Sequence, residues 1–221
     1  SALDLVYDMV ALLPRDPVTI TGSLTLRRRH GVVLRELKFR MKLDWGSEPA
    51  SAQYSIMDNL GTELETMAVS RTRGNPPSFT HTTASGDNRS VNLADAIQDT
   101  DISWTDLTLS FLWWKGSAVI GRDEIRGRPC YIVEVTPPET GGAGQYSKAH
   151  LWVDEQMHML LQAKGFDAQG KEIRSLWVKG FKKIDERWMI KDMEIQSSQA
   201  HRTKLLIDDV DTPDADKDPK P

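Results

Sequence analysis

Alternation of apolar and polar residues dominates the chain and predicts a protein built mainly of β-strands. In VTITGSLTLRR, residues 18–28, apolar side chains alternate with Thr and Ser, and LRELKFRMKLDW, residues 34–45, alternates them with Lys and Arg. A period of two gives a strand with one buried and one solvated face. Because His30 and Gly31 supply a turn between them, the two segments predict a long antiparallel hairpin.

The same pattern continues over most of the remaining chain. AQYSIMDN and TELETMAVSRT, joined at residues 59–61, predict a second hairpin, whereas residues 72–92 contain little that a core could use and predict a long loop. Beyond residue 116, apolar segments separated by turn residues predict one continuous antiparallel sheet. These segments are SAVIGRDEI, RPCYIVEVTP, SKAHLWVD, MHMLLQAKGFD, KEIRSLWVKGF, RWMIKDMEIQ and HRTKLLIDD. The turns between them are expected at 126–127, 137–144, 154–155, 167–170, 185–186 and 197–198.

Two segments have helical rather than strand periodicity. Apolar residues between Ala2 and Leu13 recur at helical spacing until Pro14 ends the pattern. In DISWTDLTLSFLWW, residues 101–114, Ser103 and Asp106 have the spacing of a capping box and predict a helix over 104–114. One face of that helix would carry Trp104, Leu107, Phe111 and Trp114. A strand is the alternative, because residues 107, 109, 111 and 113 are also apolar at alternating positions.

Composition places the chain among globular proteins and argues against a polyanionic partner. Its 221 residues are 39% hydrophobic and 27% charged, with a formal net charge of −4, so nucleic acid is not expected as a ligand. We expect a single domain over residues 1–209 and a disordered acidic tail over 210–221. The basic run Arg27–Arg29 is interpreted as a solvated edge that discourages sheet pairing.

No catalytic or metal-binding motif stands out. The five histidines lack zinc-site spacing; His150 and His158 lie in neighbouring predicted strands and are interpreted as packed or surface residues. The single cysteine, Cys130, is interpreted as a buried strand thiol. Because neither a nucleophile–base pair nor a phosphate-binding loop is present, we expect no enzymatic activity, no metal and no cofactor.

Seven Trp and eight Met are many for this length, and they gather in 104–114 and in the later strands. Most of them fit an ordinary core. The same residue types also suit a cavity for flexible acyl chains, because Met repacks easily and Trp offers a broad rigid wall.

The order of these segments resembles the outer-membrane lipoprotein-sorting (LolA-like) family of bacterial envelope proteins. The resemblance covers residues 1–209 and rests on the N-terminal helix, the long strands and a set of pattern motifs. The motifs are DLTLSFL at 106–112, GRDEIRGRPCYIVEV at 121–135, YSKAHLWVD at 146–154, DAQG at 167–170 and W-x-x-K-D-M-E-I at 188–195.

The resemblance implies an α+β fold, a strongly curved antiparallel half-barrel (an incomplete β-barrel) with helices packed in its concave face. It implies a monomeric, non-enzymatic periplasmic carrier that holds the acyl chains of a lipoprotein or another lipid for transfer toward the outer membrane. Its partners would be an envelope transporter or an outer-membrane protein. Residues 104–114 would form the lid. The family's lid-latching arginine is not identified by motif, and Arg28, Arg35 and Arg40 are candidates by region.

The N-terminus and the cavity complete these expectations. The chain opens on a helix, so we expect that any signal peptide or acylated N-terminal Cys has been removed with a preceding segment.

The alternative function is a structural or interaction module of an envelope export complex, with a densely packed core and no cargo. The residues expected to line the apolar cavity are Leu37, Phe39, Met41, Tyr54, Ile56, Trp104, Leu107, Phe111, Trp114, Met159 and Trp177.

Overall fold

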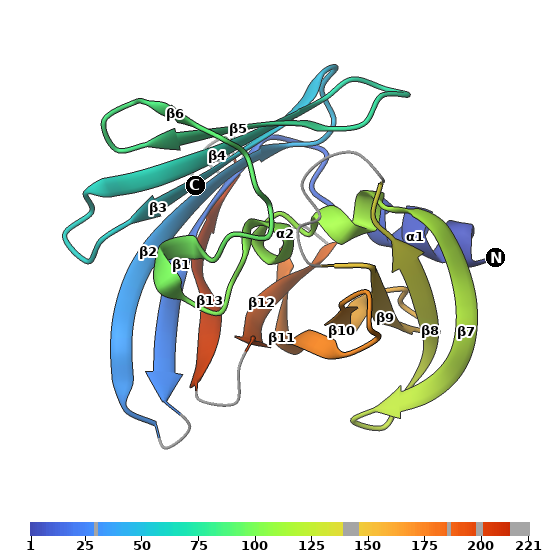
Figure 1. The fold of residues 1–221 in the computed structure, drawn as a ribbon. Coiled ribbons are helices and arrows are strands. Elements are labelled where there is room, and N and C mark those ends of the chain that lie inside the picture. Colours follow the sequence, from blue (N-terminus) through green and yellow to red (C-terminus); the bar gives the residue numbers. More distant parts are fainter. Residues whose placement is uncertain (29–30, 139–145, 185–186, 198–200, 213–221) are drawn as a thin grey trace, which may run out of the picture. The chain divides into compact units, whose positions relative to one another are not determined.

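A computed structural model of the chain describes residues 1–28, 31–138, 146–184, 187–197 and 201–212 (Figure 1). These residues form two compact units. The first unit comprises Ser1–Leu12, Thr25–Arg35 and Asn92–Leu205; the second comprises Leu13–Leu24, Glu36–Val91 and the described chain from Leu206 onward. The single domain over 1–209 stays a prediction, and most of the predicted disordered tail, residues 213–221, lies outside the described residues.

The strands form one antiparallel sheet, as the alternation predicts. Its order is β6-β5-β4-β3-β2-β1-β13-β12-β11-β10-β9-β8-β7, so β6 and β7 are edge strands and the sheet is not closed. The strands are β1 (Val18–Arg28), β2 (Val33–Asp44), β3 (Ala50–Met57), β4 (Glu63–Arg71), β5 (Ser78–Thr83), β6 (Asn88–Arg89), β7 (Lys115–Ile125), β8 (Arg128–Thr136), β9 (Lys148–Asp154), β10 (Leu160–Phe166), β11 (Glu172–Ile184), β12 (Arg187–Gln196) and β13 (His201–Asp211). The helical elements are α1 (Ala2–Ala11), η1 (Ile97–Asp99), α2 (Trp104–Leu107) and η2 (Ser110–Trp113).

Both predicted hairpins are confirmed: β1 lies beside β2 in the sheet, and β3 pairs with β4 in antiparallel register. In the second unit β2 also pairs with β3, and alternating apolar residues such as Leu37, Phe39 and Met41 are buried. Gly22 in β1 allows a close approach, because a Cβ there would lie 2.1 Å from the Leu206 carbonyl oxygen and 2.5 Å from the Phe39 ring. A side chain at this position would therefore push the packed elements apart.

The predicted long loop over residues 72–92 is wrong in part, because β5 and β6 extend this sheet there. SFTHTT has few apolar residues but three Thr, whose β-branched side chains favour a strand. Its inward position carries His81, which is buried and lies 2.8 Å from the Glu65 carboxylate. A polar pair takes the place of an apolar contact, which is why the hydrophobic pattern missed this strand.

The apolar segments after residue 116 form β7 to β13, and the first unit contains them up to Leu205 in β13. The turns predicted at 185–186, at 198 and over 139–144 lie outside the described residues. Cys130 is fully buried, as predicted, and burial raises the pKa of its thiol. The N-terminal helix α1 has Ser1 as its N-cap and lies against β7 and η2 (Figure 1).

The continuous helix predicted over 104–114 is wrong, and so is the strand alternative. Ser103 caps α2 as predicted, but the helix ends after one turn, and Leu109 has a left-handed backbone with φ 50° before η2 begins. The segment contains no Gly, the residue that usually adopts a left-handed backbone, so its sequence gave no signal for this break. The break nevertheless leaves Trp104, Leu107, Phe111 and Trp114 buried.

At the end of β9, the Asp154 carboxylate accepts hydrogen bonds from Arg128 Nε at 2.7 Å and from the backbone N–H groups of Gln156 and Met157. Burial acts to raise the pKa of Asp154, but these hydrogen bonds outweigh it and the pKa is lowered. A carboxyl whose folded-state pKa is lowered stabilises the fold above its unfolded pKa, about 3.9, and loses that contribution as the pH falls through the folded value.

We therefore expect Asp154→Asn to lower stability at pH 7 and to make the fall in stability below about pH 4 shallower. Urea midpoints measured between pH 7 and pH 2.5 would check this. Asp208→Asn removes the same charge from an exposed position of β13 and is the matched control. An unchanged acid slope in Asp154→Asn would contradict the assignment.

Candidate functional site

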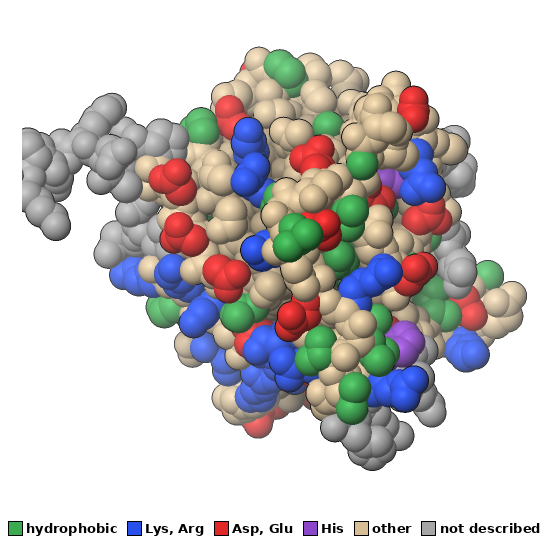
Figure 2. All heavy atoms as spheres, turned by 90° about the vertical axis from the view of Figure 1, so that its left-hand side faces the viewer, with side chains coloured by type: hydrophobic (Ala, Val, Ile, Leu, Met, Phe, Trp, Pro, Cys, Tyr) green, Lys and Arg blue, Asp and Glu red, His purple; other side chains and the backbone are tan. Residues whose placement is uncertain are grey.

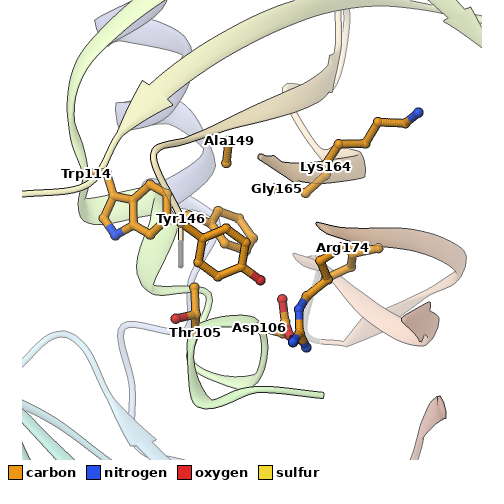
Figure 3. A pocket seen from close by; sticks show the side chains of 11 residues that line it. Thr105, Asp106, Trp114, Tyr146, Ala149, Lys164, Gly165 and Arg174 are labelled. Carbon is orange, nitrogen blue, oxygen red and sulfur yellow. The ribbon is translucent and has the colours of Figure 1, made fainter. Parts of the chain in front are cut away.

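The candidate site lies in the first unit, where α2 and η2 cover one face of β9, β10 and β11. Helical and strand residues together enclose a small cavity of about 20 Å³ (Figure 3). This volume is space for about one water molecule. Its lining residues are Thr105, Asp106, Phe111, Trp114, Tyr146, Ala149, Ala163, Lys164, Gly165, Arg174 and Leu176.

Aromatic rings form the apolar end of this site. The Trp114 and Tyr146 rings are tilted by 58° with centroids 5.8 Å apart, and Figure 3 shows them side by side. Gly165 of β10 lies directly against Tyr146, since a Cβ at Gly165 would be 2.0 Å from the ring. Small residues in the strands, including Ala149 and Ala163, thus make room for large rings from the covering segment.

An ion pair forms the polar end. Arg174 Nη1 of β11 lies 2.8 Å from Asp106 Oδ2 and also donates to the Asp101 carbonyl oxygen. Both side chains are largely buried, Arg174 at 14% exposed and Asp106 at 6%. Burial alone lowers the pKa of Arg174, but the Asp106 carboxylate outweighs it, so the pKa is raised and the guanidinium stays charged. Burial also raises the pKa of Tyr146, whose hydroxyl points toward this pair in Figure 3.

Asp106 also helps to cap the start of α2. Its carboxylate accepts hydrogen bonds from Ser103 N at 2.8 Å and Ser103 Oγ at 2.7 Å, which forms the predicted capping box. One carboxylate therefore both caps the helix and attaches it to β11. Loss of the contact with Arg174 would free the helix from the strand without removing its cap.

A second polar attachment precedes α2. Asp101 is fully buried, and its carboxylate accepts hydrogen bonds from Ser197 N, Ser197 Oγ and Thr203 Oγ1 at 2.6–3.1 Å. His201 Nδ1 lies 3.1 Å from the same group. These contacts connect the segment before α2 to β12 and β13.

A wider cleft of about 320 Å³ adjoins the small cavity, and Tyr146 and Arg174 line both. Its other lining residues are Ala94, Lys171, Glu172, Ile173 and Ser197. The cleft is more polar than the small cavity, because charged side chains surround it. An apolar space and a more polar one thus lie on either side of Tyr146 and Arg174.

The structure places the predicted cavity residues in both units. Trp104, Leu107, Phe111, Trp114 and Met159 are buried in the first unit, and Phe111 and Trp114 line the small cavity. The second unit buries Leu37, Phe39, Met41, Tyr54 and Ile56.

Trp177 is placed differently from the other predicted cavity residues. It alternates along β11 with the buried Leu176 and Val178, so it lies on the other face of the strand. Cationic groups of Lys179 and Arg202 lie 5.8 and 5.5 Å from its ring centroid. We therefore leave Trp177 out of the proposed site.

Arg174 is not among the latch candidates that the sequence suggests by region, which are Arg28, Arg35 and Arg40. Arg28 and Arg40 are exposed, and Arg35 donates to the Gln98 carbonyl oxygen. The signal for Arg174 is its position in EIRSLWV, where it shares a strand face with Leu176 and Val178. A basic residue on an otherwise buried strand face requires a specific partner.

The described residues hold no candidate for either of two features, a metal site and a membrane-spanning helix. Among the residues that the structure describes, no group of three or more His, Cys, Asp or Glu side chains could hold a metal ion. No helix in the same part of the chain is long and apolar enough to cross a membrane.

Three solved bacterial structures share this fold. A DUF1329 family protein from Desulfovibrio piger matches with a TM-score of 0.78 and 19% identity over 97% of this chain and 92% of its own. A putative outer membrane lipoprotein-sorting protein domain from Vibrio parahaemolyticus gives 0.78 and 13% over 97% and 94%. A LolA superfamily protein from Nitrosomonas europaea gives 0.74 and 12% over 97% and 96%.

No curated protein matches the sequence. A family model described as "Uncharacterized protein" matches residues 81–218, more than half of the chain and all of the candidate site. The chain therefore belongs to this family, and its fold is LolA-like.

Proposed function

We propose that the chain is a non-enzymatic lipid-binding protein of the bacterial cell envelope, which holds an acyl chain between the α2–η2 segment and strands β9 to β11. The observation that carries this proposal is an aromatic-rich segment that covers small strand residues and is joined to β11 by a buried ion pair.

In this proposal, the small volume of the cavity corresponds to a closed, empty state of the site. A cavity of about 20 Å³ holds no acyl chain, so the segment is closed over the strands, and ligand entry requires its displacement. Opening would separate Arg174 from Asp106 and expose the buried apolar side chains of the segment. An acyl chain that buries about ten methylenes gains about 8 kcal/mol, at about 0.8 kcal/mol each. This gain would offset the apolar contacts that the segment loses, and reclosure of the segment would favour release of the cargo.

The expected cargo follows from the two ends of the site. Once the segment is displaced, the apolar end would accept an acyl chain, and the cleft at Lys171 and Arg174 would face its polar head. In this proposal the protein works in the periplasm and passes a lipoprotein or another lipid toward an outer-membrane partner, as the lipoprotein-sorting description of the Vibrio relative suggests. The LolA-like resemblance implies helices packed in the concave face of a curved sheet, and that arrangement would suit this role.

The dense packing favours a second candidate function, a module of an envelope export complex that binds protein and carries no lipid. In that case Phe111 and Trp114 are ordinary core residues and the ion pair is structural. The two functions differ in whether acylated molecules bind under the segment.

Native mass spectrometry of protein purified from a bacterial envelope, with organic extraction of the same sample, tests the proposal. We expect a co-purifying acylated lipid or lipopeptide, and we expect Trp114→Ala to weaken binding of a dansyl-labelled C12 fatty acid by about tenfold or more, since a buried Trp contributes at least about 1.5 kcal/mol. Trp188→Ala, at a Trp that is 40% exposed, is the matched control. An apo mass that incubation with lipid leaves unchanged would favour the interaction module.

A further inference from the structure

The turn between β1 and β2 carries apolar side chains that no core accounts for. Val32, Val33 and Leu34 are consecutive and are 59%, 44% and 44% exposed. An alternating strand buries every second residue, as Leu37 and Phe39 show further along β2, but here all three side chains face solvent. A group of exposed apolar residues on a soluble domain marks an interaction surface.

The charge of the same turn is opposite to that of the chain. Residues 25–35, TLRRRHGVVLR, contain four Arg and no Asp or Glu, in a chain whose net charge is −4. Arg27 and Arg28 are exposed, while Arg29 and His30 lie outside the described residues. Arg35 is 41% exposed and lies 3.8 Å from Asp99, a solvent-exposed contact of little strength. Exposed cations therefore flank the apolar group.

We infer that the described residues beside this turn, Arg27, Arg28 and 31–35, bind the surface of an anionic lipid membrane. Apolar side chains would enter the headgroup boundary, and the Arg side chains beside them would contact lipid phosphates. Figure 1 shows the ends of β1 and β2 that flank this turn, and Figure 2 shows basic and apolar side chains close together on one face of the molecule.

A membrane fits the turn better than a folded protein partner does. A stable protein interface buries about 800 Å² on each side, whereas three half-exposed side chains at the tip of a hairpin offer much less. A lipid surface needs no complementary groove and adapts to a protruding tip. Charge complementarity also favours it, because each Arg near an anionic leaflet contributes about 1 kcal/mol. The inference goes beyond the proposed function, since a protein without lipid cargo could use the same contact.

Vesicle co-sedimentation tests the inference directly. Vesicles of phosphatidylethanolamine with phosphatidylglycerol, and vesicles of phosphatidylcholine alone, would be compared at low and high salt. We expect binding to the anionic vesicles that weakens with salt. Arg27→Gln with Arg28→Gln should weaken it about thirtyfold, which corresponds to two charges at about 1 kcal/mol each, and Val33→Ser with Leu34→Ser should weaken it at least about tenfold.

Matched controls keep the test specific. Val119→Ser with Ile120→Ser removes apolar side chains that are 44% and 48% exposed on β7, and Lys183→Gln with Lys191→Gln removes two exposed charges. These variants should bind vesicles as the wild type does. Absence of vesicle binding by the wild type, or equal losses in the control and turn variants, would overturn the inference. Both turn variants should retain binding of the labelled fatty acid. A negative result for membrane binding can therefore be told apart from a negative result for the proposed cargo site.

Discussion

Arg174→Met is expected to lower the free energy of unfolding by about 3–5 kcal/mol. The substitution keeps a long apolar stem on β11 but leaves the Asp106 carboxylate buried and without its cationic partner. Asp106 would keep its hydrogen bonds from Ser103, which offset only part of that cost. The hydrogen bond to the Asp101 carbonyl oxygen would be lost as well. Chemical denaturation followed by Trp fluorescence would measure the effect.

Two further variants distinguish loss of the ion pair from general disruption of the fold. Arg174→Met combined with Asp106→Asn removes both charges while the amide oxygen can still cap α2, so the double variant should recover more than half of the loss. Arg128→Met removes a pair in which Arg128 is 42% exposed, and we expect a smaller effect there. A double variant less stable than Arg174→Met would show that the two residues do not act as a pair.

The same variants report on the proposed function. If the ion pair holds the segment closed, removing both charges should raise the affinity for the labelled fatty acid, because less free energy is needed to displace the cover. If the protein carries no lipid, the double variant differs from the wild type only in stability. Comparing the change in fatty-acid affinity with the change in stability of the double variant therefore distinguishes a segment that opens from one that is a fixed part of the core.

The strands could be predicted because one local rule determines them. In β1 and β2, alternation alone places Ile20, Leu24, Leu37 and Phe39 on the buried face, and the structure buries all four. The prediction failed where side chains of another kind fill the core, as His81 does in β5. It failed again at Leu109, whose left-handed backbone is set by the packing of its neighbours and by no signal in its own sequence.

The candidate site was only partly visible for a related reason. Phe111 and Trp114 could be found from their place in an apolar segment, because burial follows from residue type. The pairing of Arg174 with Asp106 spans 68 residues, and that of Asp101 with Thr203 spans 102. Such contacts depend on how β11 and β13 are placed beside the segment. The buried-face position of Arg174 shows that a partner is needed but does not identify it.

Trp104→Ala is expected to destabilise the protein by about 3–5 kcal/mol, the usual cost of deleting a large aromatic side chain from a closed core. Trp104 is 1% exposed and begins α2, and its carbonyl oxygen accepts a hydrogen bond from Thr108 Oγ1. Because Trp104 does not line the small cavity, its loss should affect the fold more than ligand binding. Trp113→Ala, at the partly exposed Trp of the same segment, should cost less.

The pattern of effects along the segment then decides between the two candidate functions. A lipid carrier predicts that Trp104→Ala mainly lowers stability while Trp114→Ala mainly weakens fatty-acid binding, since Trp114 lines the cavity. An interaction module predicts that both substitutions lower stability and that neither has a ligand to lose. Urea denaturation of each variant, with and without the labelled fatty acid, measures both quantities in one experiment. A ligand that stabilises the wild type but not Trp114→Ala would favour the carrier, because only binding to the folded state raises stability.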